Sequence, residues 1–188
     1  DFWRYTVFLG IRQLIGEGND QYVDDMYSTN DGELLIVSRP SFADVVALDL
    51  DNGEIVWRFE VDGARSDHMA LSPDGTQVAV SASTGSVVHL LNVYTGEEEG
   101  RFPTGNSPHE NLYSDDGKYI YHSSIGFVFM PFDGKVLRDT TRGERKFIVY
   151  DTEAEEIVKD IDIKAKLEEA GLGDLSPSIR PMAHTSDY

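Results

Sequence analysis

The sequence contains no cysteine and few basic residues, and both shortages exclude kinds of site. Without cysteine there can be no disulfide, no thiolate metal ligand and no cysteine nucleophile. The 188 residues include 16 Lys or Arg against 34 Asp or Glu, a formal net charge of −18. This charge repels phosphate backbones, so we expect no nucleic-acid partner, whereas divalent cations and basic partners are compatible with it. A well-solvated acidic surface would give the same net charge.

Long apolar runs are also absent. No stretch approaches the roughly 20 apolar residues that span a bilayer, so no membrane span is predicted. Residues 1–10 (DFWRYTVFLG) lack the basic start, apolar run and cleavage site of a signal peptide. The sequence has no Walker loop, no Gly-rich dinucleotide fingerprint, and no HExxH or GxSxG motif. With 40% hydrophobic and 11% aromatic residues, the chain is expected to fold around a core.

An Asp-Gly pair recurs at a nearly constant interval. It stands at 31–32, 74–75 and 116–117, so the separations are 43 and 42 residues. The alternating apolar stretch that follows each pair (ELLIVS, TQVAVSAS and KYIYHSS) predicts a strand after a hairpin turn. A second phrase also recurs, as VVALDLDNGE, VVHLLNVYTGE and KFIVYDTEAEE. Its copies keep the same interval, except that 16 additional residues precede the third copy. Each repeat therefore predicts four short strands.

A four-stranded antiparallel unit of about 42 residues is typical of a β-propeller blade. The predicted fold is all-β, a β-propeller of such blades, with the chain covering roughly four blades of a larger ring of seven or eight. A small four-bladed ring closed by the last strand is the alternative. The predicted segments are the outer strands of a preceding blade (1–22), a blade (23–66), a second blade (67–108), a third blade (109–180) with an insertion at 125–146 and a helical loop at 163–180, and the first strand of a next blade (181–188).

Two phrases carry a family resemblance. MALSPDGTQVAVSASTGSVVHLLNVYTGE resembles the YVTN and WD40-like bacterial propeller repeats, and ALDLDNGEIVWRF is similar to a blade of the PQQ-type repeat. The resemblance covers roughly residues 23–160, and the Trp-Asp and Gly-His signatures of WD40 repeats are missing. It implies a periplasmic, cell-envelope or secreted protein. Such propellers include binding proteins, lactonases, lyases and quinoprotein subunits, so the resemblance is informative about fold more than function.

Ionisable pairs precede each inner strand, seven and six residues before the turn Asp. In a propeller these positions lie at the mouth of the central channel. The pairs are Asp24 with Asp25, Asp67 with His68, and His109 with Glu110, and a fourth turn at Asp187 would place Arg180 and Pro181 there. Carboxylate and imidazole groups that converge from neighbouring blades can bind a divalent metal or transfer protons. Alternatively, these residues cap the loops that enter the strands.

Candidate roles follow from these positions. A divalent metal is the one cofactor that the sequence suggests. The candidate metal ligands are Asp67, His68, His109, Glu110 and, in the last predicted inner strand, His184. The candidate catalytic residues are His68, His109, Glu110 and His122, and the candidate ligand-binding residues are Asp24, Asp25, Asp67, Arg138, Arg142 and Arg180.

The insertion at 125–146 is expected to open on the same face as the mouth. It combines the apolar phrase FVFMPF with Arg138, Arg142, Arg145 and Lys146. The insertion could therefore close over an anionic or sugar-like ligand. Alternatively, its aromatic residues only pack the insertion against the rest of the protein. The first functional hypothesis is a protein that binds a small-molecule or protein ligand at the mouth, with the rest of the ring supplied by more chain or a second polypeptide. The alternative is a metal-assisted lyase or lactonase-like hydrolase for a carbohydrate-like or acidic small molecule. A quinoprotein subunit ranks last.

Overall fold

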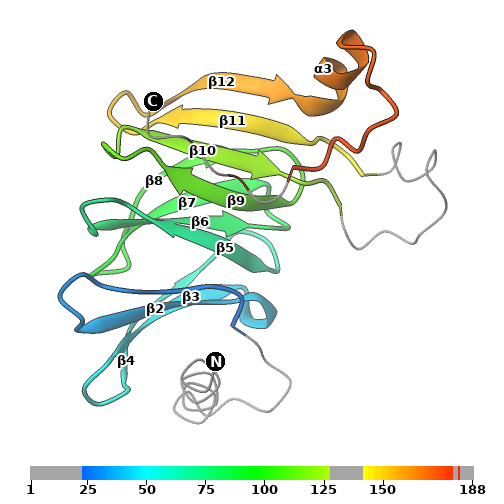
Figure 1. Cartoon of the computed structure of the whole chain (residues 1–188). Coiled ribbons are helices and arrows are strands. Elements are labelled where there is room, and N and C mark those ends of the chain that lie inside the picture. The colour runs from blue at the N-terminus through cyan, green and yellow to red at the C-terminus, as the bar shows by residue number, and fades with distance from the viewer. Residues whose placement is uncertain (1–22, 128–141, 180–181, 183–188) are drawn as a thin grey trace, which may run out of the picture.

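Three antiparallel sheets of four strands make up most of the molecule (Figure 1). The structure is a computed structural model that describes residues 23–127, 142–179 and 182. The first sheet holds β1 (Met26–Ser28), β2 (Leu34–Arg39), β3 (Asp44–Asp49) and β4 (Ile55–Glu60), with the short 3-10 helix η1 (Pro40–Phe42) after β2. The second holds β5 (Ser66–Leu71), β6 (Gln77–Ala82), β7 (Val87–Asn92) and β8 (Glu98–Pro103). The third holds β9 (Pro108–Tyr113), β10 (Tyr119–Ser124), β11 (Lys146–Asp151) and β12 (Glu156–Asp162), and α3 (Ile163–Glu169) follows it.

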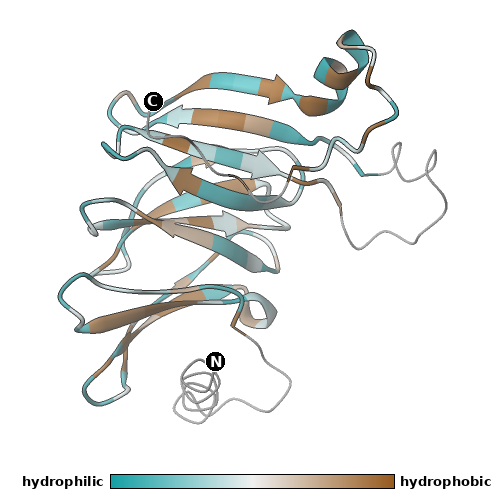
Figure 2. Cartoon of the chain, viewed as in Figure 1, coloured by the Kyte–Doolittle hydropathy of each residue, from teal (hydrophilic) through white to brown (hydrophobic). Residues whose placement is uncertain are grey.

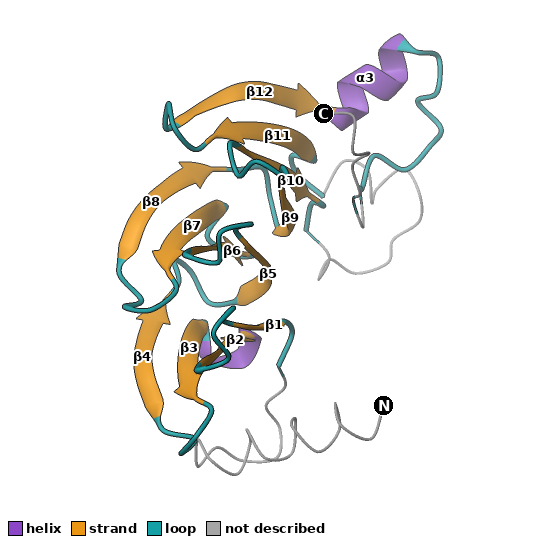
Figure 3. Ribbon diagram, turned by 60° about the vertical axis from the view of Figure 1, so that its left-hand side comes forward, coloured by secondary structure: helices purple, strands orange, loops and turns teal. Residues whose placement is uncertain are grey.

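Within each sheet the strands pair in the order of the sequence. The sheets stack face to face (Figure 1), and the first strands β1, β5 and β9 gather on one side while β4 and β8 lie on the other (Figure 3). Contacts between β5 and β9 and between β2 and β5 join successive sheets. This arrangement is that of propeller blades around an axis, so the sheets are called the first, second and third blades, and β1, β5 and β9 their inner strands.

The predicted Asp-Gly turns are present, and their side chains explain why they form. In the second blade the Ser72 hydroxyl donates to Asp74 Oδ1 at 2.6 Å, and the Thr76 N–H donates to the same oxygen at 3.1 Å. Gly75 takes a φ of +75°, which side-chain-bearing residues avoid. The hydrogen bonds lower the pKa of Asp74. The other two blades repeat the device, with hydroxyl groups at positions 29 and 114 that donate to the turn carboxylates at 31 and 116.

Apolar faces of neighbouring blades form the core. Ile36, Val45, Met69, Val80 and Leu91 are buried together between the first and second blades. A second cluster lies between the second and third blades and includes Ala79, Leu90, Phe102, Ile120 and Ile148. Figure 2 shows hydrophobic residues along the strands and hydrophilic ones at most turns. The middle strands β2, β3, β6 and β7 are buried on both faces, and their sequences are correspondingly rich in apolar residues.

The third blade carries additional chain. β10 ends at Ser124 and β11 begins at Lys146, so the extra segment joins the second and third strands of that blade. Its two ends are held together by the Phe127 N–H, which donates to the Arg142 carbonyl at 2.8 Å. Residues 128–141, and with them Arg138, lie outside the described residues, as do 1–22 and the predicted strand at 181–188 apart from Met182.

Helix α3 lies within the segment 163–180 that the sequence predicts to be a helical loop. Asp162 is the N-cap and accepts the Ala165 N–H at 3.0 Å. The C-cap is Ala170, and Gly171 follows it with a φ of +72°, the left-handed conformation that glycine commonly supplies after a C-cap. No helix among residues 23–127 and 142–179 is long and apolar enough to cross a membrane.

Candidate metal centre

Irregular strand pairing brings the mouth residues to the axis. In the second blade the pairing passes from Ser66 with Ala82 to Met69 with Val80, so two residues, Asp67 and His68, oppose one. In the third blade the pairing of β9 with β10 passes over His109. Such β-bulges bend a strand and redirect its side chains, and they are frequent beside functional sites. The bulges therefore direct these three side chains toward a common point.

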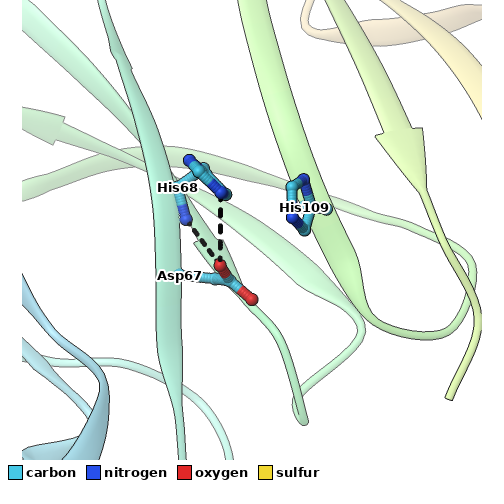
Figure 4. Close-up of side chains that lie close together, drawn as sticks. All are labelled: Asp67, His68 and His109. Carbon is cyan, nitrogen blue, oxygen red and sulfur yellow. Dashed lines mark hydrogen bonds and ion pairs between the residues drawn. The ribbon is translucent and has the colours of Figure 1, made fainter. Parts of the chain in front are cut away.

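Asp67 and His68 of β5 lie beside His109 of β9 (Figure 4). One ligand atom from each of the three residues lies within 4.8 Å of the other two. The imidazole rings are 4.2 Å apart between centroids and inclined by 46°. Asp67 Oδ1 accepts the His68 N–H at 3.1 Å and lies 3.9 Å from His68 Nε2. Asp67 is buried, whereas His68 keeps about a third of its side chain exposed, so the cluster is anchored on one side and open on the other.

The three side chains have the chemistry of a zinc-type site. Zinc binds imidazole nitrogen and carboxylate oxygen at about 2.0–2.2 Å, which places tetrahedral ligands about 3.4 Å apart. The three ligand atoms, within 4.8 Å of one another, are thus spaced somewhat more widely than in a filled site. Calcium and magnesium prefer oxygen ligands alone, so two imidazoles favour Zn²⁺ or another late transition metal. Three protein ligands would leave one coordination position for a ligand, as in catalytic and binding zinc sites.

Further carboxylates flank the two imidazoles. Asp25 Oδ2 accepts the Met69 N–H at 3.0 Å and lies 3.9 Å from His68 Nδ1. Glu110 Oε2 lies 3.8 Å from His109 Nδ1. Carboxylates in these places orient imidazole ligands and increase their basicity. Glu110, a predicted metal ligand, is therefore beside the three-residue cluster and not within it.

Burial changes the acidity of these groups. Burial, together with the neighbouring Asp67 carboxylate, raises the pKa of Asp24 to about 6. Burial also raises the pKa of Asp25 and of Glu110. Among the described residues, Arg65 contacts this group, with its guanidinium 3.7 Å from Asp24 Oδ2 and 3.8 Å from Asp67 Oδ2. Of the side chains that the structure describes around the cluster, carboxylates thus outnumber cations, which favours a divalent cation there.

We expect Asp24→Asn to stabilise the protein above pH 6 by about 1 kcal/mol, after allowance for solvent screening. The raised pKa of Asp24 means that its charged form is disfavoured by folding, so the native protein is penalised above that pKa of about 6. The gain should fall as the pH drops from 6 toward 4, because Asp24 then takes up a proton in the native state and no longer carries the buried charge that Asn removes. Urea unfolding of both proteins at pH 8, 6 and 4 measures this. A gain that does not depend on pH would contradict it.

His122, a predicted catalytic residue, is enclosed between the second and third blades. It is fully buried, and burial lowers its pKa to about 3. Asn111 Nδ2 donates to Ser81 Oγ at 2.9 Å, so Asn111 Oδ1 accepts from His122 Nδ1 at 2.8 Å. His122 Nε2 then accepts the Ser124 hydroxyl at 3.0 Å. This network holds β9 against β6, and the nearby His109 of the mouth cluster further disfavours the charged form of His122 and so also lowers its pKa.

The remaining predicted residues divide into two groups. Arg142 lies at the described end of the insertion, Arg145 is buried, and Lys146 binds Asp160 at 2.9 Å. Arg138, Arg180 and His184 lie outside the described residues. The sequence analysis did not single out Asn111. Asn111 occupies the position at which the other two inner strands carry Met26 and Met69, and this change from apolar to polar could have identified it.

Comparison with known proteins shows the fold. No family model and no curated protein matches the sequence. Hydrazine synthase of Kuenenia stuttgartiensis is similar in structure, with a TM-score of 0.58, 20% identity, and coverage of 74% of this chain and 35% of that one. The β-propeller domain of Cps50 (Swd1) from Myceliophteria thermophila gives a TM-score of 0.58 with 13% identity, and coverage of 76% and 43%.

The chain therefore spans less than half the length of either solved structure. At these identities the likeness concerns the fold, and the assignment to YVTN or PQQ-type repeats stays a prediction. The stacked four-stranded sheets and both comparisons agree, and the chain is part of a β-propeller.

Proposed function

We propose that this protein is a ligand-binding propeller that holds a divalent transition-metal ion, Zn²⁺ by preference, at its channel mouth. Asp67, His68 and His109 would bind the ion, and its open coordination position would face the ligand. The observation that carries the proposal is the convergence of three ligand atoms from two blades within 4.8 Å. The surrounding excess of carboxylates supports a cation at this point.

Metal content and metal affinity test the proposal. Protein purified without chelators should contain about one equivalent of zinc or a related metal by plasma mass spectrometry. Titration calorimetry with Zn²⁺ should show His68→Ala and His109→Ala each weakening binding by about 100-fold, since even the loss of a supporting residue costs 10–100-fold.

Asp67→Asn and Asp51→Asn form a matched pair for the same titration. Both remove one negative charge, but Asp51 is exposed in a turn outside the cluster. Asp67→Asn should weaken Zn²⁺ binding, and Asp51→Asn should leave it unchanged. A protein without metal and without measurable Zn²⁺ binding, or equal effects of the two variants, would refute the site.

A metal-assisted lyase or hydrolase for a carbohydrate-like or acidic small molecule is the second candidate. Asp24 favours it, because a carboxyl with a pKa of about 6 beside Asp67 is suited to exchange protons near neutral pH. In that case Asp24→Asn would abolish turnover of lactone or uronate substrates while Zn²⁺ binding persists. Absence of turnover by the metal-loaded parent protein would leave the binding function alone.

A further inference from the structure

A buried serine recurs on the second strand of each of the three described blades. Ser38, Ser81 and Ser123 each stand seven residues after the turn Asp of their blade. All three side chains are fully buried, and each lies at the mouth end of its strand. Their repetition indicates a common role in the repeat.

In the first two blades this serine hydrogen-bonds to the inner strand of the following blade. Ser38 Oγ donates to the Asp67 carbonyl at 2.8 Å and lies 3.0 Å from Ser66 Oγ. Ser81 Oγ accepts from Asn111 Nδ2 at 2.9 Å. Each bond crosses from β2 or β6 to the next inner strand, so the serine links one blade to its successor.

The third serine has no such bond among the described residues. Ser123 Oγ is buried and without a hydrogen-bond partner there. Ser123 pairs across the sheet with Phe147, whose ring stacks on Tyr121 at 6.4 Å between centroids. Tyr121, Ser123, Phe147 and Val149 share the face of the third blade that points away from the second, called here the outward face. A buried hydroxyl needs a partner, and its equivalents find theirs on a following inner strand.

The described chain returns to the end of β10 after α3. Ser178 Oγ donates to the Ile125 carbonyl at 2.9 Å, immediately beyond the end of β10. Three residues later the segment 181–188 begins. In it Met182 stands five residues before Asp187, as Met26 and Met69 stand five residues before Asp31 and Asp74. The same position in the third blade is Asn111, the partner of Ser81.

We propose that residues 181–188 pack on the outward face as the inner strand of a fourth blade, with Ser123 Oγ hydrogen-bonded to that strand. The outward face itself holds none of the three residues of the metal cluster. The packing would place Arg180 at the channel mouth, at the position of the fourth blade that corresponds to His109 in the third. It would thus add a cation beside the carboxylates.

A disulfide cross-link tests this packing, and the absence of native cysteine makes it unambiguous. Ser123→Cys with Met182→Cys should form an intrachain disulfide in most molecules of the full-length protein under mild oxidation, since the two positions must lie within disulfide reach. Ser81→Cys with Asn111→Cys is the positive control, because those side chains are in contact. Ser38→Cys with Met182→Cys is the negative control.

Two outcomes would overturn the proposal. One is no cross-link at 123–182 when the positive control is cross-linked, and the other is a cross-linked dimer, which would assign the face to a second copy. If the double variant fails to fold, Met182→Asp in the full chain replaces it. Amide exchange of β10 should then become about tenfold faster while that of β2 stays unchanged, and equal rates in parent and variant would refute the packing.

Discussion

Replacing Asp44 with alanine is expected to lower the free energy of unfolding by about 3–5 kcal/mol. Asp44 begins β3 and is fully buried, and Arg39 on β2 is buried beside it. Arg39 Nε donates to Asp44 Oδ1 at 2.7 Å, and the Arg39 guanidinium also donates to Oδ2 at 2.5 Å. Arg58 on β4, half exposed, approaches Oδ2 at 2.5 Å. Without the carboxylate, the buried Arg39 charge loses the group that binds it at two points, and breaking a buried ion pair by removing one partner is costly.

Two further variants separate the buried charge from general damage. Asp51→Ala removes an exposed carboxylate and should change the stability by less than about 0.5 kcal/mol. Arg39→Met combined with Asp44→Leu removes both charges and should recover most of the loss, because apolar residues often replace buried pairs without penalty. Urea unfolding followed by circular dichroism measures all three. If Asp44→Ala resembles Asp51→Ala, water reaches Arg39 and the explanation fails.

Gly96→Ala is expected to cost about 2–5 kcal/mol of stability. Gly96 has a φ of +71°, and alanine in this left-handed conformation costs about 1–2 kcal/mol. A Cβ on Gly96 would also lie 2.5 Å from the Trp57 ring, which is buried and donates to the Val93 carbonyl at 2.9 Å. Overpacking of this kind adds about 1–3 kcal/mol.

Gly32→Ala is the matched control for the steric part of this loss. Gly32 has nearly the same φ, +75°, but no heavy atom lies within 4 Å of a Cβ built there. It should therefore cost about 1–2 kcal/mol, the conformational part alone. In a Trp57→Ala background the cost of Gly96→Ala should fall to that of Gly32→Ala. Equal costs of the two glycine substitutions in the parent protein would show that Trp57 moves aside freely.

The sequence predicts the blades well because their signals are local. Asp74 and Gly75 form their turn with side chains two residues away, so the period of these turns gives the repeat directly. The short apolar runs after the turns then predict buried strands. The counting that places Asp67, His68 and His109 at the mouth relies on the same period.

The details of the candidate site depend on features that the period does not contain. Glu110 lies outside the three-residue cluster because the bulge in β9 falls at His109, and a one-residue change of register redirects a side chain. His122 is enclosed because it shares the strand face of Ile120, which packs on Phe102. Strand alternation could have predicted this burial, whereas the bond from Asn111 to Ser81 joins residues 30 positions apart and needs the blades in place.

Each sheet is completed by four strands that are consecutive in the chain. During synthesis, the ladder of one blade can form as soon as its fourth strand emerges from the ribosome, before any of the next blade exists. The apolar face with Ile36 and Val45 is then exposed until the second blade arrives to cover it. The interval between successive blades is thus when the nascent chain is most prone to aggregate and most in need of a chaperone.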